Sequence, residues 1–380
     1  MMPSFLPALA DASNYPRPRV PMTPYLSHAA LARRSLAQQR FGLGTRPCAV
    51  TVSGRAALGR LAAHLKLTPR DRVLLPAYHC PSMVEPFMHA GCELEFYPLN
   101  ADLSPHREDF KRALCLPTRL VVFVNFFGLE PPAEDCIAQA RAAGVTIVHD
   151  CAHAYYALPG IPPDDYAIAS LVKFFALEEG GLLLAPTGAP LDAPRGKAGL
   201  RRNLGLLSRA LARRRAACAS LDARPAARAA VAGRVAATAT PAPAFRYFEP
   251  RDMARGPGLY TRLLFNVLGA EHAAAQRRRN YVELAEVVDG LRGVHLLYPA
   301  LPAGAVPYVL PFLLDDAPVQ FDAIRGAGVP LYRWEELIPT ACPVSADYRT
   351  RLVQLPCHQD LSARHRDELR AALTRSLGQA

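Results

Sequence analysis

Between Val50 and Pro186, short apolar segments rich in β-forming residues alternate with amphipathic segments, and this alternation constrains the fold more than any other feature. The pattern is typical of a parallel or mixed sheet with helices on its faces. The expected strands are Arg72–Pro76, Leu94–Pro98, Arg119–Asn125, Val145–His149 and Gly181–Ala185. The expected helices are Ala56–Leu65, Ser82–Ala90 and Ala133–Ala143, with Gly91 and Gly144 as stops. We therefore expect a large α/β domain.

The C-terminal part of the chain predicts a smaller α+β domain. Its expected elements are a helix at Glu271–Leu291, a strand at Val309–Leu314, and helices at Pro318–Ala327 and Ser362–Leu377. We place the large domain in residues 1–245 and the small one in residues 246–380. Residues 201–243 are rich in Ala and Arg, which indicates either long helices or a mobile insertion.

Length and composition favour a two-part globular enzyme of 380 residues. Hydrophobic residues make up 51% and charged residues 20%, and no apolar run approaches the roughly 18 residues of a membrane span. Met1–Ala10 lacks the basic start of a secretory signal, and the nine cysteines show no paired spacing. We expect a soluble cytoplasmic protein with free thiols, no membrane partner and no metal.

The net charge of +11 favours anionic partners but does not identify them. Nucleic acid is disfavoured because the basic stretch from residue 201 to 244 contains no interleaved aromatic residues. Of the 44 basic residues only four are lysines: Lys66, Lys111, Lys173 and Lys197. A lysine in so arginine-rich a chain is a candidate for chemistry, because an ammonium can lose its proton whereas a guanidinium in practice cannot.

Lys173 is the lysine with the most unusual surroundings, since it lies within the apolar segment Ala169–Leu177. Burial lowers the pKa of an amine and thereby favours attack on a carbonyl carbon. The alternative is a lysine exposed on a surface loop.

Asp150 directly follows an expected strand, at the edge where open α/β sheets place ligands. A carboxylate there can pair with a ring nitrogen, although Asp150 can equally be a helix N-cap. His149, Asp150, Cys151 and His153 also suggest a metal, but His149 and Asp150 should point to opposite faces of the strand.

Ser53–Leu58 is a small-residue turn that leads into a helix, where free N–H groups and the helix dipole favour a phosphate. A plain helix start is the alternative. A phosphate turn, a strand-end carboxylate and an apolar lysine together match the phosphate, ring nitrogen and aldehyde of pyridoxal 5'-phosphate.

Three segments of this chain resemble motifs of the DegT/DnrJ/StrS family of fold type I aminotransferases, the sugar aminotransferases. Ser53–Leu58 is similar to that family's Ser-Gly-Thr-Ala-Ala-Leu turn, and His149–His153 to its Glu-Asp-Ala-Ala-Gln segment. Lys173–Gly181 resembles the family's lysine-to-Gly-Gly run and keeps its spacing. Asp165 and Ser170 are similar to an Asp and a phosphate-binding Ser of the family. The resemblance implies a three-layer α/β/α large domain with a mainly parallel sheet.

The resemblance also implies roles for individual residues. Lys173 would hold the cofactor's aldehyde carbon covalently, and Asp150 would pair with the ring nitrogen. The residues implied to hold the phosphate are Ser53, Gly54, Arg55 and Ser170. His153 would lie near the phenolic oxygen, and Cys80 occupies the position of a stacking aromatic residue. Tyr78 and His79 stand near enough in the sequence to supply a ring, but the sequence does not decide between them and other aromatic residues.

The C-terminal half resembles the same family in Arg277–Tyr281, in Val329–Trp334 and in Leu355–His358. Arg333 beside Trp334, the single tryptophan, suggests a clamp for an anionic substrate, with packing in the core as the alternative.

The function expected from these residues and the resemblance is transfer of an amino group. Glutamate would donate it to a keto group on a nucleotide-activated sugar or on a secondary-metabolite or polysaccharide precursor. A homodimer is implied, with Arg246, Tyr247 or arginines of the Ala/Arg-rich stretch crossing to the partner. Departures from the family at Arg55, Cys80 and His153 motivate an alternative, a cofactor-binding regulator or partner subunit without turnover.

Overall fold

The computed structural model describes residues 3–9, 14–27, 46–194, 196, 198–219, 245–268 and 270–378. Residues 220–243 of the Ala/Arg-rich stretch and Lys197 lie outside these ranges. The first part of that stretch is a single long helix, α6 (Leu200–Ala219).

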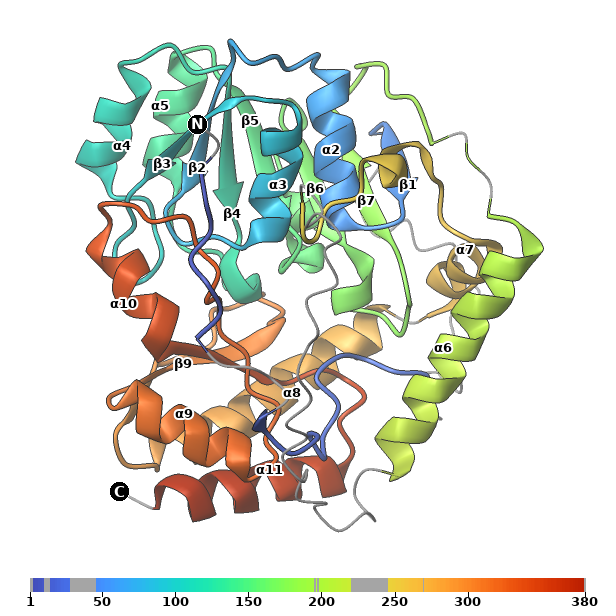
Figure 1. Cartoon of the computed structure of the whole chain (residues 1–380), viewed down its shortest axis with the longest axis vertical. Coiled ribbons are helices and arrows are strands. Elements are labelled where there is room, and N and C mark those ends of the chain that lie inside the picture. The colour runs from blue at the N-terminus through green and yellow to red at the C-terminus, as the bar shows by residue number, and fades with distance from the viewer. Residues whose placement is uncertain are drawn as a thin grey trace, which may run out of the picture.

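A seven-stranded sheet forms the upper part of the molecule (Figure 1), in the order β1-β7-β6-β5-β4-β2-β3. Its strands are β1 (Cys48–Thr51), β2 (Arg72–Pro76), β3 (Glu93–Tyr97), β4 (Leu120–Val124), β5 (Thr146–Cys151), β6 (Tyr166–Ser170) and β7 (Gly181–Leu184). All run parallel except β7, which is antiparallel to both of its neighbours. The carboxyl ends of the parallel strands therefore meet at one edge.

Helices cover both faces of this sheet because its strands are apolar on both sides. On one face, α2 (Gly54–His64) and α3 (Pro81–His89) share a core with Val73 and Leu75 of β2. On the other face, α4 (Arg107–Leu114) and α5 (Glu134–Ala142) share a core with Leu74. The expected three layers and mainly parallel sheet are confirmed.

The C-terminal half contains a three-stranded antiparallel sheet in the order β10-β9-β8. Its elements are α7 (Leu259–Val267), α8 (Ala270–Asp289), β8 (Val294–Leu296), β9 (Val309–Leu314), α9 (Ala317–Gly326), α10 (Pro343–Arg351), β10 (Leu352–Pro356) and α11 (Ala363–Leu377). One hydrophobic core joins this half to the face of the large sheet that carries α4 and α5. The predicted boundary at residue 246 stays a prediction.

The described N-terminal segment packs against the C-terminal half. Leu6 N donates to Leu337 O at 2.8 Å, and Arg19 forms an ion pair with Glu368 at 2.7 Å. His358 Nε2 lies 2.9 Å from Pro21 O. These contacts bring Met22 and Thr23 to the wall of the cavity that holds the candidate site.

The strands predicted at Arg72–Pro76 and Val309–Leu314 have the bounds that the structure shows. Strands β1, β6, β8 and β10 were not predicted. β6 runs directly into the lysine segment, which hides its end. Among the described helices, none is long and apolar enough to cross a membrane.

Candidate active site

All of the predicted site residues line one cavity of about 670 Å³. They are Ser53, Gly54, Arg55, Cys80, Asp150, His153, Ser170 and Lys173. Most of them follow or end parallel strands, so the topology gathers them at the carboxyl edge of the large sheet. Their individual roles stay predictions.

The start of α2 lines the cavity and packs against the first residue of β7, Gly181. Ser53 is the N-cap of α2, and its hydroxyl accepts a hydrogen bond from Ala56 N at 3.2 Å. A Cβ on Gly181 would lie 2.3 Å from the carbonyl carbon of Ser53, and Gly180 has a φ of +138°. The Gly-Gly pair is therefore required for β7 to approach the turn.

Lys173 ends a short 3-10 turn (Leu171–Lys173) that follows β6. Its side chain opens into the cavity, and Nζ lies 5.3 Å from the centre of the Tyr308 ring. Burial lowers the pKa of Lys173, while the neighbouring Cys80 and Asp150 oppose this shift and Arg55 adds to it. The structure therefore favours the neutral, nucleophilic amine over the surface lysine.

Arg277 of α8 fixes the backbone of the lysine segment from the C-terminal half. It is fully buried, and its guanidinium donates to Lys173 O at 2.8 Å and to Pro307 O and Tyr308 O at 3.1 Å. Gln359 donates to Phe174 O at 2.8 Å. The sequence shows Arg277 only as part of a family-like segment, because nothing local reveals a contact across 104 positions.

Asp150 lies near the carboxyl end of β5 and is 6% exposed. Burial raises the pKa of this carboxyl, while the N–H of Ala152 at 2.8 Å and the charge of Lys173 oppose the shift. No helix begins at Asp150, since the next helical turn starts at Tyr155, so the N-cap alternative is wrong. A cationic ring nitrogen would compensate the buried carboxylate.

His153 forms a second buried polar wall of the cavity. Its ring lies 4.6 Å from that of Tyr308 and 5.3 Å from that of Trp334, measured between centroids. Burial, and then the charge of Lys173, lower the pKa of His153 well below its usual value, so the imidazole is neutral near pH 7. Nδ1 has no hydrogen-bond partner among the described residues, as expected for an atom that awaits a ligand.

Neither Tyr78 nor His79 lines the cavity, so the structure favours neither of the two nearby candidates for a stacking ring. Tyr78 stacks on the far side of Trp334 at 5.0 Å, and His79 stacks on Phe96 at 4.7 Å. Both are fully buried in the core after β2. The rings on the cavity wall come instead from His153 and from residues of the C-terminal half.

The guanidinium of Arg333 is engaged by partners of its own chain. Its Nε pairs with Glu335 at 2.5 Å, Nη1 donates to Thr350 O at 3.3 Å, and its guanidinium lies 3.7 Å from the centre of the Phe321 ring. The structure therefore favours the packing role that the sequence left open over the anionic clamp.

Segment 245–248 is anchored beside the mouth of the cavity by a buried carboxylate. Glu85 of α3, 2% exposed, accepts the backbone N–H groups of Arg246, Tyr247 and Phe248 at 3.0, 2.9 and 2.6 Å. Tyr247 Oη donates to Glu336 at 2.5 Å, and Arg246 pairs with the same carboxylate. Both residues expected to cross to a partner are thus bonded within their own chain.

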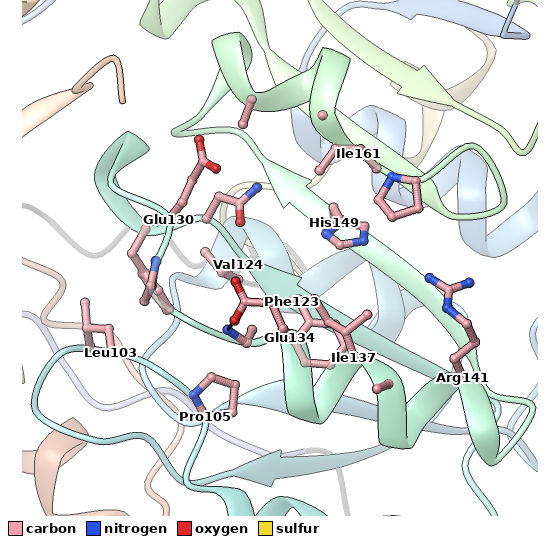
Figure 2. Close-up of a pocket in the computed structure, with 18 of the residues that line it drawn as sticks. Leu103, Pro105, Phe123, Val124, Glu130, Glu134, Ile137, Arg141, His149 and Ile161 are labelled. Carbon is pink, nitrogen blue, oxygen red and sulfur yellow. Dashed lines mark hydrogen bonds between the residues drawn. The ribbon is translucent and has the colours of Figure 1, made fainter. Parts of the chain in front are cut away.

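A larger cavity, of about 720 Å³, lies beyond β5 on the face that carries α5. Figure 2 shows His149 and Phe123 in its wall, with Glu130 and Arg141 at opposite ends. His149 Nε2 lies 2.9 Å from Asp165, and Arg141 donates to the same carboxylate at 2.8 Å. Burial opposes ionisation of Asp165, but these two partners lower its pKa.

The residues described in that larger cavity include no lysine, so the chemistry gathers in the smaller one. His149 and Asp150 face different cavities, as their alternation along a strand predicts. They cannot ligate the same metal ion.

The sheet order and the cavity at its carboxyl edge give the chain the fold type I architecture of pyridoxal-phosphate-dependent transferases. Residues 39–160 match the model of the DegT/DnrJ/EryC1/StrS aminotransferase family, in agreement with the resemblance of the two motifs that this range contains. The match includes the Ser53 turn and Asp150 but ends before Lys173. No curated protein sequence matches the chain.

Solved structures with this fold include a DegT/DnrJ/EryC1/StrS aminotransferase from Brucella abortus, which is 15% identical with a TM-score of 0.59. The match covers 93% of this chain and 92% of that one. PseC from Helicobacter pylori, an aminotransferase of pseudoaminic acid biosynthesis, is 12% identical over 94% and 93% of the two chains, with a TM-score of 0.62. The PLP form of a provisionally assigned sugar aminotransferase from Streptococcus pneumoniae is 16% identical over 94% and 99%, with a TM-score of 0.62.

Proposed function

We propose that this protein is a pyridoxal-phosphate-dependent aminotransferase. The observation that carries the proposal is the shared cavity of Lys173, whose pKa is lowered by burial, and the buried carboxyl of Asp150. The chemistry of the lining residues fits the cofactor, because a helix N-terminus suits its phosphate and the unpartnered His153 Nδ1 suits a polar ring substituent. The fold alone does not decide the reaction, because one fold can carry several chemistries, and the residues of the site do.

When bound, pyridoxal phosphate supplies an electron sink for the carbon that bears the amino group. Lys173 would hold the group and then carry a proton on Nζ to and from the reacting carbon. Asp150, as an anion, would keep a proton on the ring nitrogen. Ser53, Gly54, Arg55 and Ser170 would bind the phosphate, and Cys80 would contact the ring. His153, being neutral, would bind an oxygen of the cofactor ring.

We infer that glutamate donates the amino group and that the acceptor is a keto group on a nucleotide-activated sugar or a related precursor. The C-terminal wall of the cavity supports a hydroxylated ring, because it combines Trp334 with the carboxylates Glu335 and Glu336, whose charges are paired but whose oxygens can each accept a further hydrogen bond. An aromatic face and hydrogen-bond acceptors together suit the apolar and hydroxyl-bearing sides of such a ring.

The proposal is tested by the absorption spectrum of the protein after addition of pyridoxal phosphate. We expect a long-wavelength band from the covalently held cofactor, its loss when glutamate is added, and its return with 2-oxoglutarate. A protein that forms no such band would contradict the cofactor assignment. A band that glutamate leaves unchanged would contradict glutamate as donor.

The alternative role as a regulator or partner subunit rests on the departures at Arg55, Cys80 and His153. Lys173 and Asp150 lie in one cavity despite these departures, which favours turnover. A band that glutamate removes and no keto acid restores would favour the regulator instead.

We also propose a homodimer whose partner helps to exclude water from the cavity. If the partner contributes to the cofactor site, retention of the cofactor should fall as the protein is diluted below its dimer dissociation constant. Light scattering and the cofactor's absorbance, recorded at several concentrations, measure both quantities. Full retention in a monomer would show that one chain completes the site.

A further inference from the structure

One side-chain nitrogen on the C-terminal wall of the cavity has no hydrogen-bond partner among the residues that the structure describes. It is Nε2 of Gln354, in the middle of β10. Gln354 is 3% exposed and lines the cavity that contains Lys173. It is the single polar residue in the strand Leu-Val-Gln-Leu-Pro.

The backbone of Gln354 fixes where the amide lies. Its N–H donates to Tyr332 O at 2.7 Å, and its carbonyl accepts from Tyr332 N at 3.2 Å. This bridge ties β10 to the segment that carries Trp334 on the same wall. The amide is therefore carried by a hydrogen-bonded strand whose neighbouring segment supplies Trp334 to the same cavity.

A buried amide N–H without a hydrogen-bond partner lowers the stability of the folded protein, because its lost hydration is not replaced. A bound ligand that accepts the hydrogen bond would replace it. Among the buried side-chain atoms without a partner, those that belong to this cavity's lining are His153 Nδ1 and Gln354 Nε2. His153 belongs to the large sheet and lies near Lys173. Gln354 belongs to the C-terminal sheet, so the two atoms serve different parts of a ligand.

The charged residues that the C-terminal half contributes to the cavity lining are paired. Arg333 pairs with Glu335 at 2.5 Å, and Glu336 is held by Arg246 and by the Tyr247 hydroxyl at 2.5 Å. A neutral donor on a wall of compensated charges suits a neutral oxygen better than a carboxylate, which would demand a cation.

We propose that Gln354 Nε2 donates a hydrogen bond to a neutral oxygen of the amino acceptor, a hydroxyl or a ring oxygen, and so contributes to acceptor selection. The inference rests on the proposed aminotransferase function. It assigns acceptor recognition to the C-terminal sheet and leaves the reacting centre to the large sheet.

The test is Gln354→Met, which keeps the length of the side chain and removes the amide. Without ligands, we expect the unfolding temperature to rise by about 2–4 °C, because an unpaired buried amide is replaced by an apolar group. In holoenzyme first reacted with glutamate, we expect the KM for a nucleotide-activated keto hexose to rise about tenfold. The glutamate half-reaction and the return reaction with 2-oxoglutarate should keep their rates.

Gln139→Met is the matched control. Gln139 lies in α5, and its buried Oε1 also has no partner among the described residues, but it is not part of this cavity's lining. Because Gln139 is half-buried, Gln139→Met should raise the unfolding temperature by less than Gln354→Met and leave the KM of every substrate unchanged.

A lower unfolding temperature in Gln354→Met would overturn the proposal, because it would show that the amide has a structural partner. An equal loss with glutamate and with the keto hexose would assign the amide to the donor and also overturn it. Wild-type holoenzyme that reacts with 2-oxoglutarate but with no keto hexose would overturn it as well. A wild-type protein inert toward glutamate would instead refute the proposed function, on which the acceptor assignment depends.

Discussion

Lys173→Arg should abolish turnover, with a loss of at least about 10³-fold in the rate of the glutamate half-reaction. Burial lowers the pKa of Lys173 and makes the neutral amine available. A guanidinium in practice stays protonated and cannot form a covalent bond to the cofactor's aldehyde carbon. Because the amine reacts only when deprotonated, attachment of the cofactor should begin at a lower pH than for an ordinary lysine.

The measurement is borohydride reduction of the holoenzyme followed by peptide mapping. We expect the label on Lys173, and Lys111→Arg on α4 should leave both label and turnover unchanged. Since arginine is larger than lysine, Lys173→Met provides a second variant in case the first one distorts the loop. Label on Lys66, Lys111 or Lys197 would exclude Lys173 as the attachment site.

Asp150→Asn should retain the cofactor but slow the glutamate half-reaction by about 10²–10⁴-fold. An amide keeps an oxygen for the N–H of Ala152, which Asp150 accepts at 2.8 Å, so the local backbone should persist. A neutral amide cannot keep the ring nitrogen protonated, and the electron sink is lost.

Stopped-flow absorbance with glutamate measures this effect. Asp165→Asn is the control, because Asp165 is a buried carboxylate on the other side of the sheet, paired with His149 and Arg141. That variant should lose stability while the half-reaction keeps its rate. A half-reaction within a few-fold of wild type in Asp150→Asn would reduce Asp150 to a structural role.

Local sequence predicted strands in both sheets. β2 and β9 are short apolar runs bounded by polar or turn residues, and their predicted bounds agree with the structure. The helices after them follow from apolar spacing and from glycines at their ends. β6 escaped prediction because it continues, with no Gly or Pro boundary, into the apolar lysine segment.

The candidate catalytic residues could also be found from the sequence, because each departs from its surroundings. Lys173 is one of four lysines among 44 basic residues and lies in an apolar segment. Asp150 lies at the end of an apolar strand, and Ser53 begins a small-residue turn. A charge among apolar neighbours is costly to bury, which singles out Lys173 and Asp150. Each signal is weak by itself, and only their combination and the resemblance to the family's motifs predicted a site.

The neighbours that these residues acquire depend on packing between distant segments. Arg277 reaches Lys173 O from α8, and Glu85 holds segment 245–248 from α3. Tyr78 was a candidate ring by its sequence position, yet it packs behind Trp334 rather than in the cavity.

The sequence by itself determined the alternation of strands and helices, the lysine, the carboxylate and the turn, because each is encoded by residues within a few positions of one another. Only the tertiary structure decided that Gln354, from β10, lines the same cavity as Lys173, from the segment after β6. The physical reason is that the free energy of burying apolar surface depends on the area buried and not on how far apart the contacting residues are in the sequence. It assembles the walls of a cavity from whichever faces pack together, and the partners of a buried polar group are known only once that packing is known.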